Sequence, residues 1–508
     1  MFAKLLSRFA CLQAVLGTLA VLSSPCLLTN VFAEEYPHQV VDTIEVPRDR
    51  LLAIEQELAF LRARDSQQQM QQNTPQDSFI EGDIALVSNN QFTCGQSTSC
   101  GCLDLPSEGF ACDCCHCQCY PCLCPLPEAP CIECPHVSTL SPYFNVSVFG
   151  ALKLDMLFGG ARAISPGTPF FLAPGVSPGF ENNYVSIHAR QSTLGAAFTG
   201  PQFGGFQSGG TLITMFFNDN VVADQYGLLP LQAFGELRNQ DWRFAAGLQF
   251  DVFSPGIPTV LPFSALAASG NAGNSFRGQL RVERFLYPSE EKQWTLQFAL
   301  SEPVVSTIDS KFRLLEDNGW PNVEGRIALG LGAVQGQGAA AKRPFEVGVS
   351  GVVGQLRSTE PAVRQVVANV WGVAVDYRWK VNDFWGFQGE MYTGQGLGTY
   401  NGGILQNLNA TTLQSIRTSG GFGEVYCYWT PCLHSHFGYG VDNPLDRDLD
   451  PAISAAGRTR NSTVFANAIW DVNATFRIGC ELTWRETSYI SLSDNEGLGF
   501  QTQFQWAF

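Results

Sequence analysis

Cysteines are the residues of this chain whose type and spacing most directly suggest chemistry. The chain has 17 cysteines, and twelve of them fall between residues 91 and 137, here called the cysteine-rich segment. The twelve are Cys94, Cys100, Cys102, Cys112, Cys114, Cys115, Cys117, Cys119, Cys122, Cys124, Cys131 and Cys134. Proline and glycine interrupt this stretch and no periodicity is visible. Covalent or metal links must therefore hold a segment that has no core of its own.

The amino terminus indicates the redox compartment that these cysteines meet. Residues 1–33 read as an export signal, in which Lys4 and Arg8 precede an apolar stretch that ends in a small-x-small cleavage site at Ala33. An exported chain reaches a compartment where disulfides can form. An even number of clustered cysteines then favours disulfides within or between chains.

Two sets of residues could instead bind a metal. In the cysteine-rich segment, two Cys-x-x-Cys pairs (119–122 and 131–134) have chelating spacing, although the surrounding thiols define no single site. The second set is His434, His436, Cys427 and Cys432. For this set we favour an exposed loop closed by one disulfide. We therefore assign no metal site.

Sites for catalysis or for a cofactor are not expected. No His-Glu-x-x-His, Gly-x-Ser-x-Gly or phosphate-binding Gly-Lys-Ser/Thr motif occurs. The formal net charge of −16 disfavours nucleic acid as a partner, because a phosphate backbone binds cationic surfaces. We expect a protein that is not an enzyme and that carries no cofactor.

Alternating strands, from about residue 141 to residue 508, must position the remaining polar residues. In Lys292–Leu300 and in Val367–Val381, apolar residues alternate with polar or charged ones, which is the period of a strand with two different faces. Charged residues make up only 15% of the chain, which is too few for the outside of a soluble sandwich. Mean hydropathy of +0.00 rules out a helical membrane protein. The pattern predicts an all-β fold, a transmembrane antiparallel barrel whose apolar face meets lipid.

The chain ends on an amphipathic strand in which Phe504, Trp506 and Phe508 share one face. A terminal Phe on such a strand is typical of the assembly signal of bacterial outer-membrane barrels. At roughly 20–25 residues for each strand with its share of loop, residues 141–508 hold about 16 strands, with 14 to 18 possible. A barrel of this size is too wide for side chains to fill, so we expect water inside it.

Four long stretches without alternation are candidate outer loops: 158–182, 254–275, 395–415 and 433–460. Of these, Ser254–Ser275 is expected to fold inward and narrow the pore, because its Pro, Ala and Leu content suits packing inside a wall.

A helix is predicted over residues 49–72, within a periplasmic linker that spans residues 34–90. Leu51, Ile54, Leu58 and Leu61 have the 3, 4, 3 spacing of a coiled-coil seam. Two heptads are too short to associate alone. The helix is therefore either an oligomerisation element supported by a larger assembly or an amphipathic helix that packs on the rest of the chain.

Five stretches of the barrel region resemble the DcaP-like porins of bacterial outer membranes. They are Phe149–Asp155, Ala189–Ser192, Leu237–Phe253, Arg277–Arg281 and Ile469–Glu481, in the order in which that family has them. The resemblance implies a trimeric channel of 16 strands with an N-terminal coiled coil. It also implies a preference for small anionic solutes such as dicarboxylates. The cysteine-rich segment is not part of the family's pattern.

Polar-face residues of the predicted strands are candidates to line the pore. They are Arg190, Arg277, Gln279, Arg281, Arg326, Arg378 and Arg477. Fixed guanidinium groups in a narrow wet pore concentrate anions. Alternatively, lumenal carboxylates on neighbouring strands, such as Glu283, Glu324 and Glu481, neutralise these cations.

The predicted function is that of a porin in the bacterial outer membrane, allowing passive diffusion of small hydrophilic solutes. Its expected partners are membrane lipid, small solutes and two further copies of the chain in a homotrimer. The alternative is an envelope protein that is anchored or crosslinked through the cysteine-rich segment.

Overall fold

The computed structural model describes residues 138–141, 144–176, 182–217, 226–289, 291–303, 320–335, 342–358, 366–453 and 456–508. The export signal, the coiled-coil residues Leu51, Ile54, Leu58 and Leu61, and all twelve cysteines of the cysteine-rich segment lie outside these residues. The predictions made for them stay predictions.

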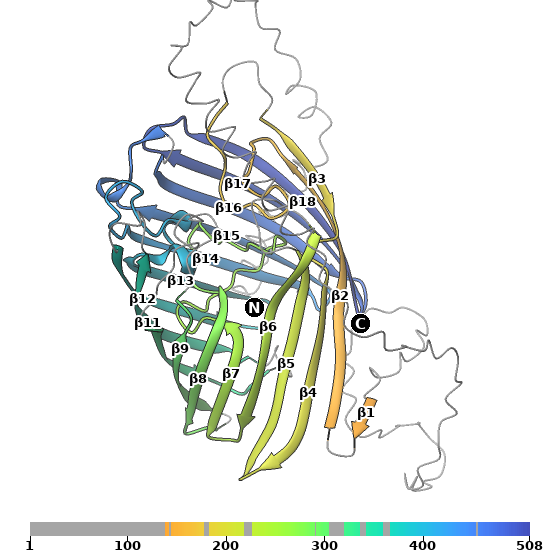
Figure 1. Ribbon diagram of the computed structural model, residues 1–508. Coiled ribbons are helices and arrows are strands. Elements are labelled where there is room, and N and C mark those ends of the chain that lie inside the picture. Colours follow the sequence, from red (N-terminus) through yellow and green to blue (C-terminus); the bar gives the residue numbers. More distant parts are fainter. Residues whose placement is uncertain are drawn as a thin grey trace, which may run out of the picture. The chain divides into compact units, whose positions relative to one another are not determined.

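The described residues form one antiparallel sheet (Figure 1). Its strands are β1 (Ser138–Ser141), β2 (Phe144–Gly159), β3 (Tyr184–His188), β4 (Thr193–Phe203), β5 (Phe206–Phe217), β6 (Tyr226–Arg238), β7 (Trp242–Phe250), β8 (Phe276–Leu286), β9 (Lys292–Ser301), β10 (Asn322–Leu331), β11 (Phe345–Ser358), β12 (Val366–Lys380), β13 (Trp385–Gln395), β14 (Arg417–Thr430), β15 (Leu433–Pro444), β16 (Arg458–Asp471), β17 (Phe476–Tyr489) and β18 (Asn495–Ala507). Short 3-10 turns are η3 (Leu397–Tyr400), η4 (Gly403–Leu405) and η5 (Asp446–Asp448). Within the described ranges, no helix is long and apolar enough to cross a membrane.

The sheet closes on itself, because the last strand pairs with β2 from Gly499 opposite Gly159 to Ala507 opposite Ala151. Strands β3 and β4 pair with different halves of β2 and together fill one place in the wall. Strand β1 adds only a short pairing at the beginning of β2. Of the 18 labelled strands, β1 takes no place of its own in the wall, and β3 and β4 share one place. The wall is therefore a closed barrel of 16 strands. The predicted fold and strand count are confirmed.

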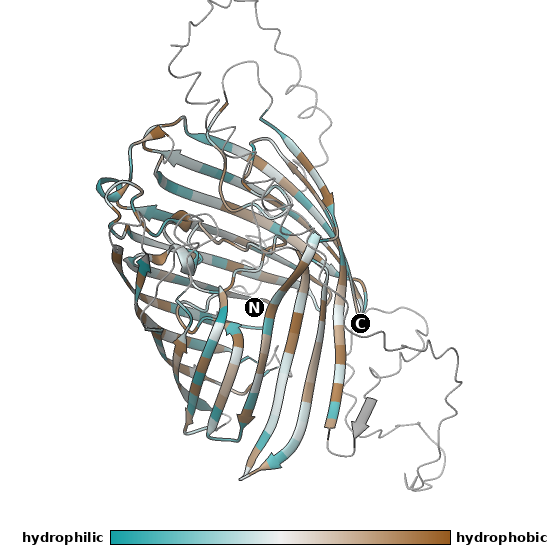
Figure 2. Cartoon of the chain, viewed as in Figure 1, coloured by the Kyte–Doolittle hydropathy of each residue, from teal (hydrophilic) through white to brown (hydrophobic). Residues whose placement is uncertain are grey.

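Hydrophobic and hydrophilic residues alternate along the strands of the wall, as the sequence pattern predicts (Figure 2). On β12, Trp371 and Val373 are 40% and 48% exposed on the outside, whereas Val370 and Ala374 are buried inside the barrel. Exposed large apolar side chains occur on strands from β2 to β18, as expected for an outward face that meets lipid. The terminal Phe508 bonds backbone to backbone with Gly150 of β2, at 3.0 and 3.1 Å, and so completes the seam of the barrel.

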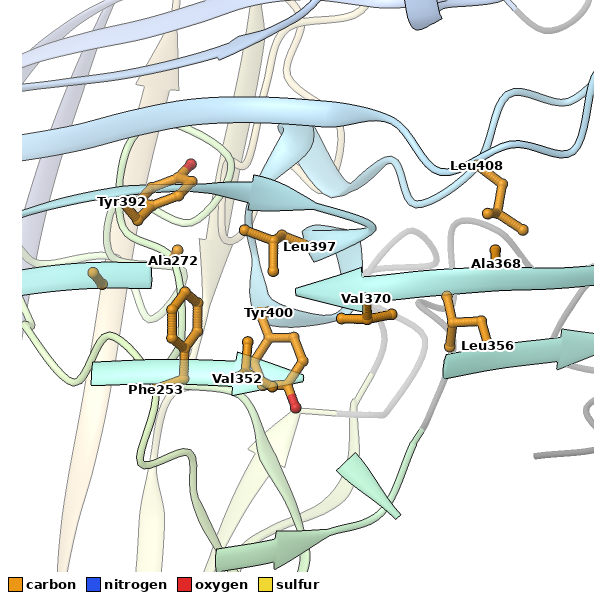
Figure 3. Close-up of a cluster of buried hydrophobic side chains, with 11 residues drawn as sticks. Phe253, Ala272, Val352, Leu356, Ala368, Val370, Tyr392, Leu397, Tyr400 and Leu408 are labelled. Atoms are coloured by element: carbon orange, nitrogen blue, oxygen red, sulfur yellow. The ribbon is translucent and has the colours of Figure 1, made fainter. Parts of the chain in front are cut away.

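The interior differs from the prediction of a wide, water-filled bore. Among the described residues, three loops fold into it rather than one: residues 160–176, residues 251–275 and residues 396–416. Phe170, Phe253, Leu397 and Ile404 of these loops are buried, and several pack on inward apolar residues of the wall such as Val352 (Figure 3). The stretch 433–460, expected as an outer loop, instead contains strand β15. Water is thus confined to what the loops leave open.

Candidate solute passage

The loop between β7 and β8, residues 251–275, is here called the constriction loop. It crosses the interior of the barrel without a strand beside it, so its backbone N–H groups need acceptors from elsewhere. Carboxylates on the wall supply them: Val252 and Phe253 donate to Glu324 (2.6 and 3.0 Å), Gly256 to Glu390 (2.9 Å), Thr259 to Glu424 (2.7 Å) and Leu261 to Glu481 (3.0 Å). These acceptors lie on β10, β13, β14 and β17. These acceptors on four separate strands fix the path of the loop across the barrel.

A cavity of about 320 Å³ lies between the constriction loop and the opposite wall, formed by strands β6 to β10. The loop contributes Asp251, Val252, Pro255, Ile257 and Asn274. The wall contributes Gln232, Phe234, Arg243, Gln249, Phe250, Arg281, Gln297 and Arg326. The volume is at the lower end of the range of small-molecule sites. A small polar solute fits between a largely apolar loop and a wall of guanidinium and amide groups.

Three arginines, Arg243, Arg281 and Arg326, give the wall of this cavity its positive groups. Each is held by carboxylates of neighbouring strands: Arg243 by Glu236 (2.5 Å) and Glu283 (3.1 Å), Arg281 by Glu283 (3.6 Å), and Arg326 by Asp376 (2.5 Å) and Glu346 (2.8 Å). The carboxylates are not themselves among the residues that line the cavity. The guanidinium groups therefore face the cavity, while ion pairs behind them fix their orientation and partly neutralise their charge.

Two predicted pore residues, Arg277 and Gln279, lie beneath the constriction loop instead of in the cavity. Arg277 is buried and donates from Nε to Oδ1 of Asp251 at 2.6 Å. Gln279 is buried and donates to the carbonyl oxygens of Gln249 and Phe250, both at 2.9 Å. These two residues hold the base of the loop. Of the predicted residues, Arg281 and Arg326 are the ones that line the cavity.

The other three predicted pore residues lie elsewhere in the barrel. Arg190, in the break between β3 and β4, is buried, and its Nη2 donates to Ser186 Oγ at 3.3 Å. Arg378 donates to the carbonyl oxygen of Arg343 at 2.8 Å. Arg477 pairs with Asp471 at 2.5 Å. The structure does not bring these arginines to the constriction.

Sequence reasoning missed Arg243 and Asp251, which both line the cavity. Arg243 alternates with the outward Phe244 on β7, so strand periodicity could have identified it. Asp251 is the first residue after β7, and no pattern marks it. Burial raises the pKa of the Asp251 carboxyl to about 7, and the adjacent Arg277 guanidinium opposes this rise.

The interpretation of His434 and His436 as part of an exposed loop is wrong. Both are buried on strand β15, because the register of β15 with β14 turns them inward. Their rings are joined by a 2.7 Å hydrogen bond between Nδ1 of His434 and Nε2 of His436, and Nδ1 of His436 is 2.6 Å from Glu424. Among the described residues, no group of three or more His, Cys, Asp or Glu side chains could hold a metal ion.

Of the two cysteines of the same hairpin, Cys427 lies on β14 and is disulfide-bonded. The bond expected between Cys427 and Cys432 stays a prediction.

A closed antiparallel barrel, apolar outside and narrowed inside by a tethered loop, has the architecture of a transmembrane β-barrel. No family model and no curated protein matches the chain. Solved structures do: the outer membrane channel DcaP of Acinetobacter baumannii has a TM-score of 0.55 at 16% identity, over 72% of this chain and 98% of that chain. An anion-selective porin from Comamonas acidovorans has a TM-score of 0.46 at 10% identity, over 72% of this chain and 100% of that chain. OmpT of Vibrio cholerae has a TM-score of 0.46 at 9% identity, over 73% of this chain and 100% of that chain.

The predicted resemblance to DcaP-like channels is confirmed at the level of the fold. The fold is that of a channel of the bacterial outer membrane.

Proposed function

We propose that this protein is an outer-membrane porin through which small hydrophilic solutes diffuse passively. The observation that carries the proposal is the cavity between the constriction loop and strands β6 to β10, lined by guanidinium and amide groups inside an apolar-coated barrel. A solute that moves down its own concentration gradient needs no energy source, and a polar lining lowers the barrier by replacing part of the water that the solute loses.

The proposal extends to a preference for small anions such as dicarboxylates. Its support is the lining of the cavity, where three arginines face a single acidic residue, Asp251. Fixed guanidinium groups in a narrow passage raise the local concentration of anions. The carboxylates behind them (Glu236, Glu283, Glu346 and Asp376) weaken this field, so we expect a moderate preference rather than exclusive anion transport.

Planar-bilayer recording of the refolded chain across a KCl gradient tests both parts. We expect discrete conductance steps and a reversal potential that indicates preferred chloride passage. The double variant Arg243→Gln/Arg281→Gln should lose most of this preference while it still conducts. A cation-preferring wild type would contradict the anion preference alone, whereas the absence of steps would contradict the channel.

A homotrimer stays a proposal, supported by the predicted seam Leu51–Leu61 and by the family resemblance. Light scattering of the detergent-extracted full chain, corrected for bound detergent, measures the number of copies. A monomer in mild detergent would contradict it.

A further inference from the structure

A second inward loop, residues 396–416 between β13 and β14, lies directly against the constriction loop. Backbone and side-chain bonds join the two: Ala268 N–H to Asn401 O (2.9 Å), Gly273 N–H to Tyr400 O (2.6 Å), Asn401 Nδ2 to Gly273 O (2.7 Å) and Ser275 Oγ to Thr399 O (3.0 Å). The wall carboxylates hold the outgoing half of the constriction loop. The second inward loop holds the returning half.

Tyr400 of the second inward loop contacts three residues that form or hold the first part of the constriction loop: Phe253, Arg277 and Glu324. Its ring is fully buried and meets the ring of Phe253 edge-on, with centroids 5.6 Å apart (Figure 3). The guanidinium carbon of Arg277 lies 4.0 Å from the ring centroid, which is a close cation–π contact. Arg277 in turn binds Asp251, the loop residue that lines the cavity.

The hydroxyl of Tyr400 reaches the first anchor of the constriction loop. It donates to Oε1 of Glu324 at 3.1 Å and accepts from Nδ2 of Asn322 at 2.9 Å. The other oxygen of Glu324 accepts the N–H groups of Val252 and Phe253. Burial raises the pKa of Tyr400 well above its ordinary value, so the hydroxyl keeps its proton and remains a donor.

The backbone that follows Tyr400 includes non-glycine residues with positive φ, a conformation that an unfolded chain rarely adopts. Asn401 has φ of 61° and Ile404 has φ of 50°. The left-handed region is a genuine outlier for a β-branched residue such as Ile404, and it persists only where surrounding contacts over-determine it. Ile404 is fully buried, and its N–H donates to Asp442 at 2.7 Å. The second inward loop is thus itself bonded to the wall, at Asp442 of β15.

We propose that the second inward loop, through Tyr400 as a positioning residue, sets the width of the solute passage. The constriction of this protein is then a device of two interlocked loops. Tyr400 touches no solute. It fixes Asp251 through Arg277, and Val252 through Glu324, and these two loop residues face the solute.

This inference rests on the proposed channel function, and three variants test it. Tyr400→Phe keeps the ring and removes the hydroxyl bridge to Glu324. Tyr400→Leu also removes the contacts with Arg277 and Phe253. Asn401→Gly removes the bond to Gly273 and suits the positive φ. Tyr439→Phe, the same change at an exposed, outward-facing tyrosine of wall strand β15, is the matched control.

Single-channel recording and swelling of liposomes in sugars of increasing size are the readouts, with heat-modified gel mobility to show that each variant folds. Loss of one hydrogen bond to a charged group should raise the frequency of resolved conductance fluctuations roughly tenfold in Tyr400→Phe. Tyr400→Leu and Asn401→Gly should admit larger sugars than the wild type, and Tyr439→Phe should not.

Unchanged fluctuations and size cut-off in folded Tyr400→Phe and Asn401→Gly would overturn the inference while leaving a conducting channel. A wild type that does not conduct would instead overturn the proposed function. If Tyr400→Leu does not fold, the two milder variants still decide.

Discussion

Asp251 is the charged residue of the passage whose ionisation changes near neutral pH. Burial raises the pKa of its carboxyl to about 7, against about 4 for an unfolded chain. The folded state therefore binds more protons than the unfolded state between these values. The stabilisation from the neutral carboxyl is complete below pH 4 and is lost as the pH rises through 7.

The same titration should change selectivity. As the pH falls through 7, Asp251 loses its charge while the guanidinium of Arg277 keeps its own, so the preference for anions should increase. Reversal potentials between pH 5 and pH 9 measure this. Asp251→Asn should show at every pH the stronger anion preference that the wild type shows at low pH. If the reversal potential of the variant changes with pH as that of the wild type does, Asp251 is not the residue that titrates.

Arg326 is the arginine whose loss should cost the most stability. It is buried and bridges Asp376 and Glu346, which would be left without a cation in Arg326→Gln. Removal of one partner from a buried ion pair costs about 3–5 kcal/mol. We expect the temperature at which the barrel unfolds, measured by the heat-dependent change of its gel mobility, to drop clearly in Arg326→Gln.

Arg477→Gln is the matched control, because Arg477 is 42% exposed in its pair with Asp471. Exposed pairs contribute about 0–1 kcal/mol. Equal losses in the two variants would show that burial does not distinguish the pairs.

At the scale of the element, the constriction loop depends on acceptors that the wall provides. Glu390 accepts the N–H of Gly256 at 2.9 Å and the side-chain amide of Asn271 at 3.1 Å. In Glu390→Ala these donors lose their acceptor, at a cost of about 1–3 kcal/mol each, and we expect a noisier and wider channel. Glu390→Gln keeps an oxygen acceptor and should restore most of the quiet conductance. Identical recordings from both variants would contradict a tethering role for the carboxylate.

Sequence alone predicted the wall better than the loops. Alternation over Val367–Val381 places Trp371 outside and Ala374 inside, because strand periodicity is local and the surrounding lipid acts on every strand alike. That residues 396–416 fold inward could not be predicted, because burial of Leu397 depends on Phe253, about 140 residues away in sequence.

The candidate site could be predicted only in part, for a related reason. Strand periodicity identifies Arg281 and Arg326 as inward residues. Which inward arginines reach open space depends on the path of the constriction loop, which covers Arg277 and leaves Arg281 facing the cavity. Register also decides the partner of each arginine: Asp376 of β12 reaches Arg326 of β10 across the intervening strand β11.

At the scale of the whole molecule, the barrel is a lipid-facing wall whose interior is largely occupied by its own loops. The three inward loops contact strands from β10 to β18 and also β3, β5 and β6, and they leave a cavity against β6–β10. Solutes should therefore pass along one side of the barrel rather than down its centre.

Two adjacent residues of β9 test this path most directly. Gln297 lines the cavity, and Phe298 points to lipid and is 48% exposed. Single-channel conductance should fall severalfold in Gln297→Trp, because the indole occupies the passage, and should stay at the wild-type value in Phe298→Trp. Wild-type conductance in a folded Gln297→Trp would contradict passage between the constriction loop and this wall.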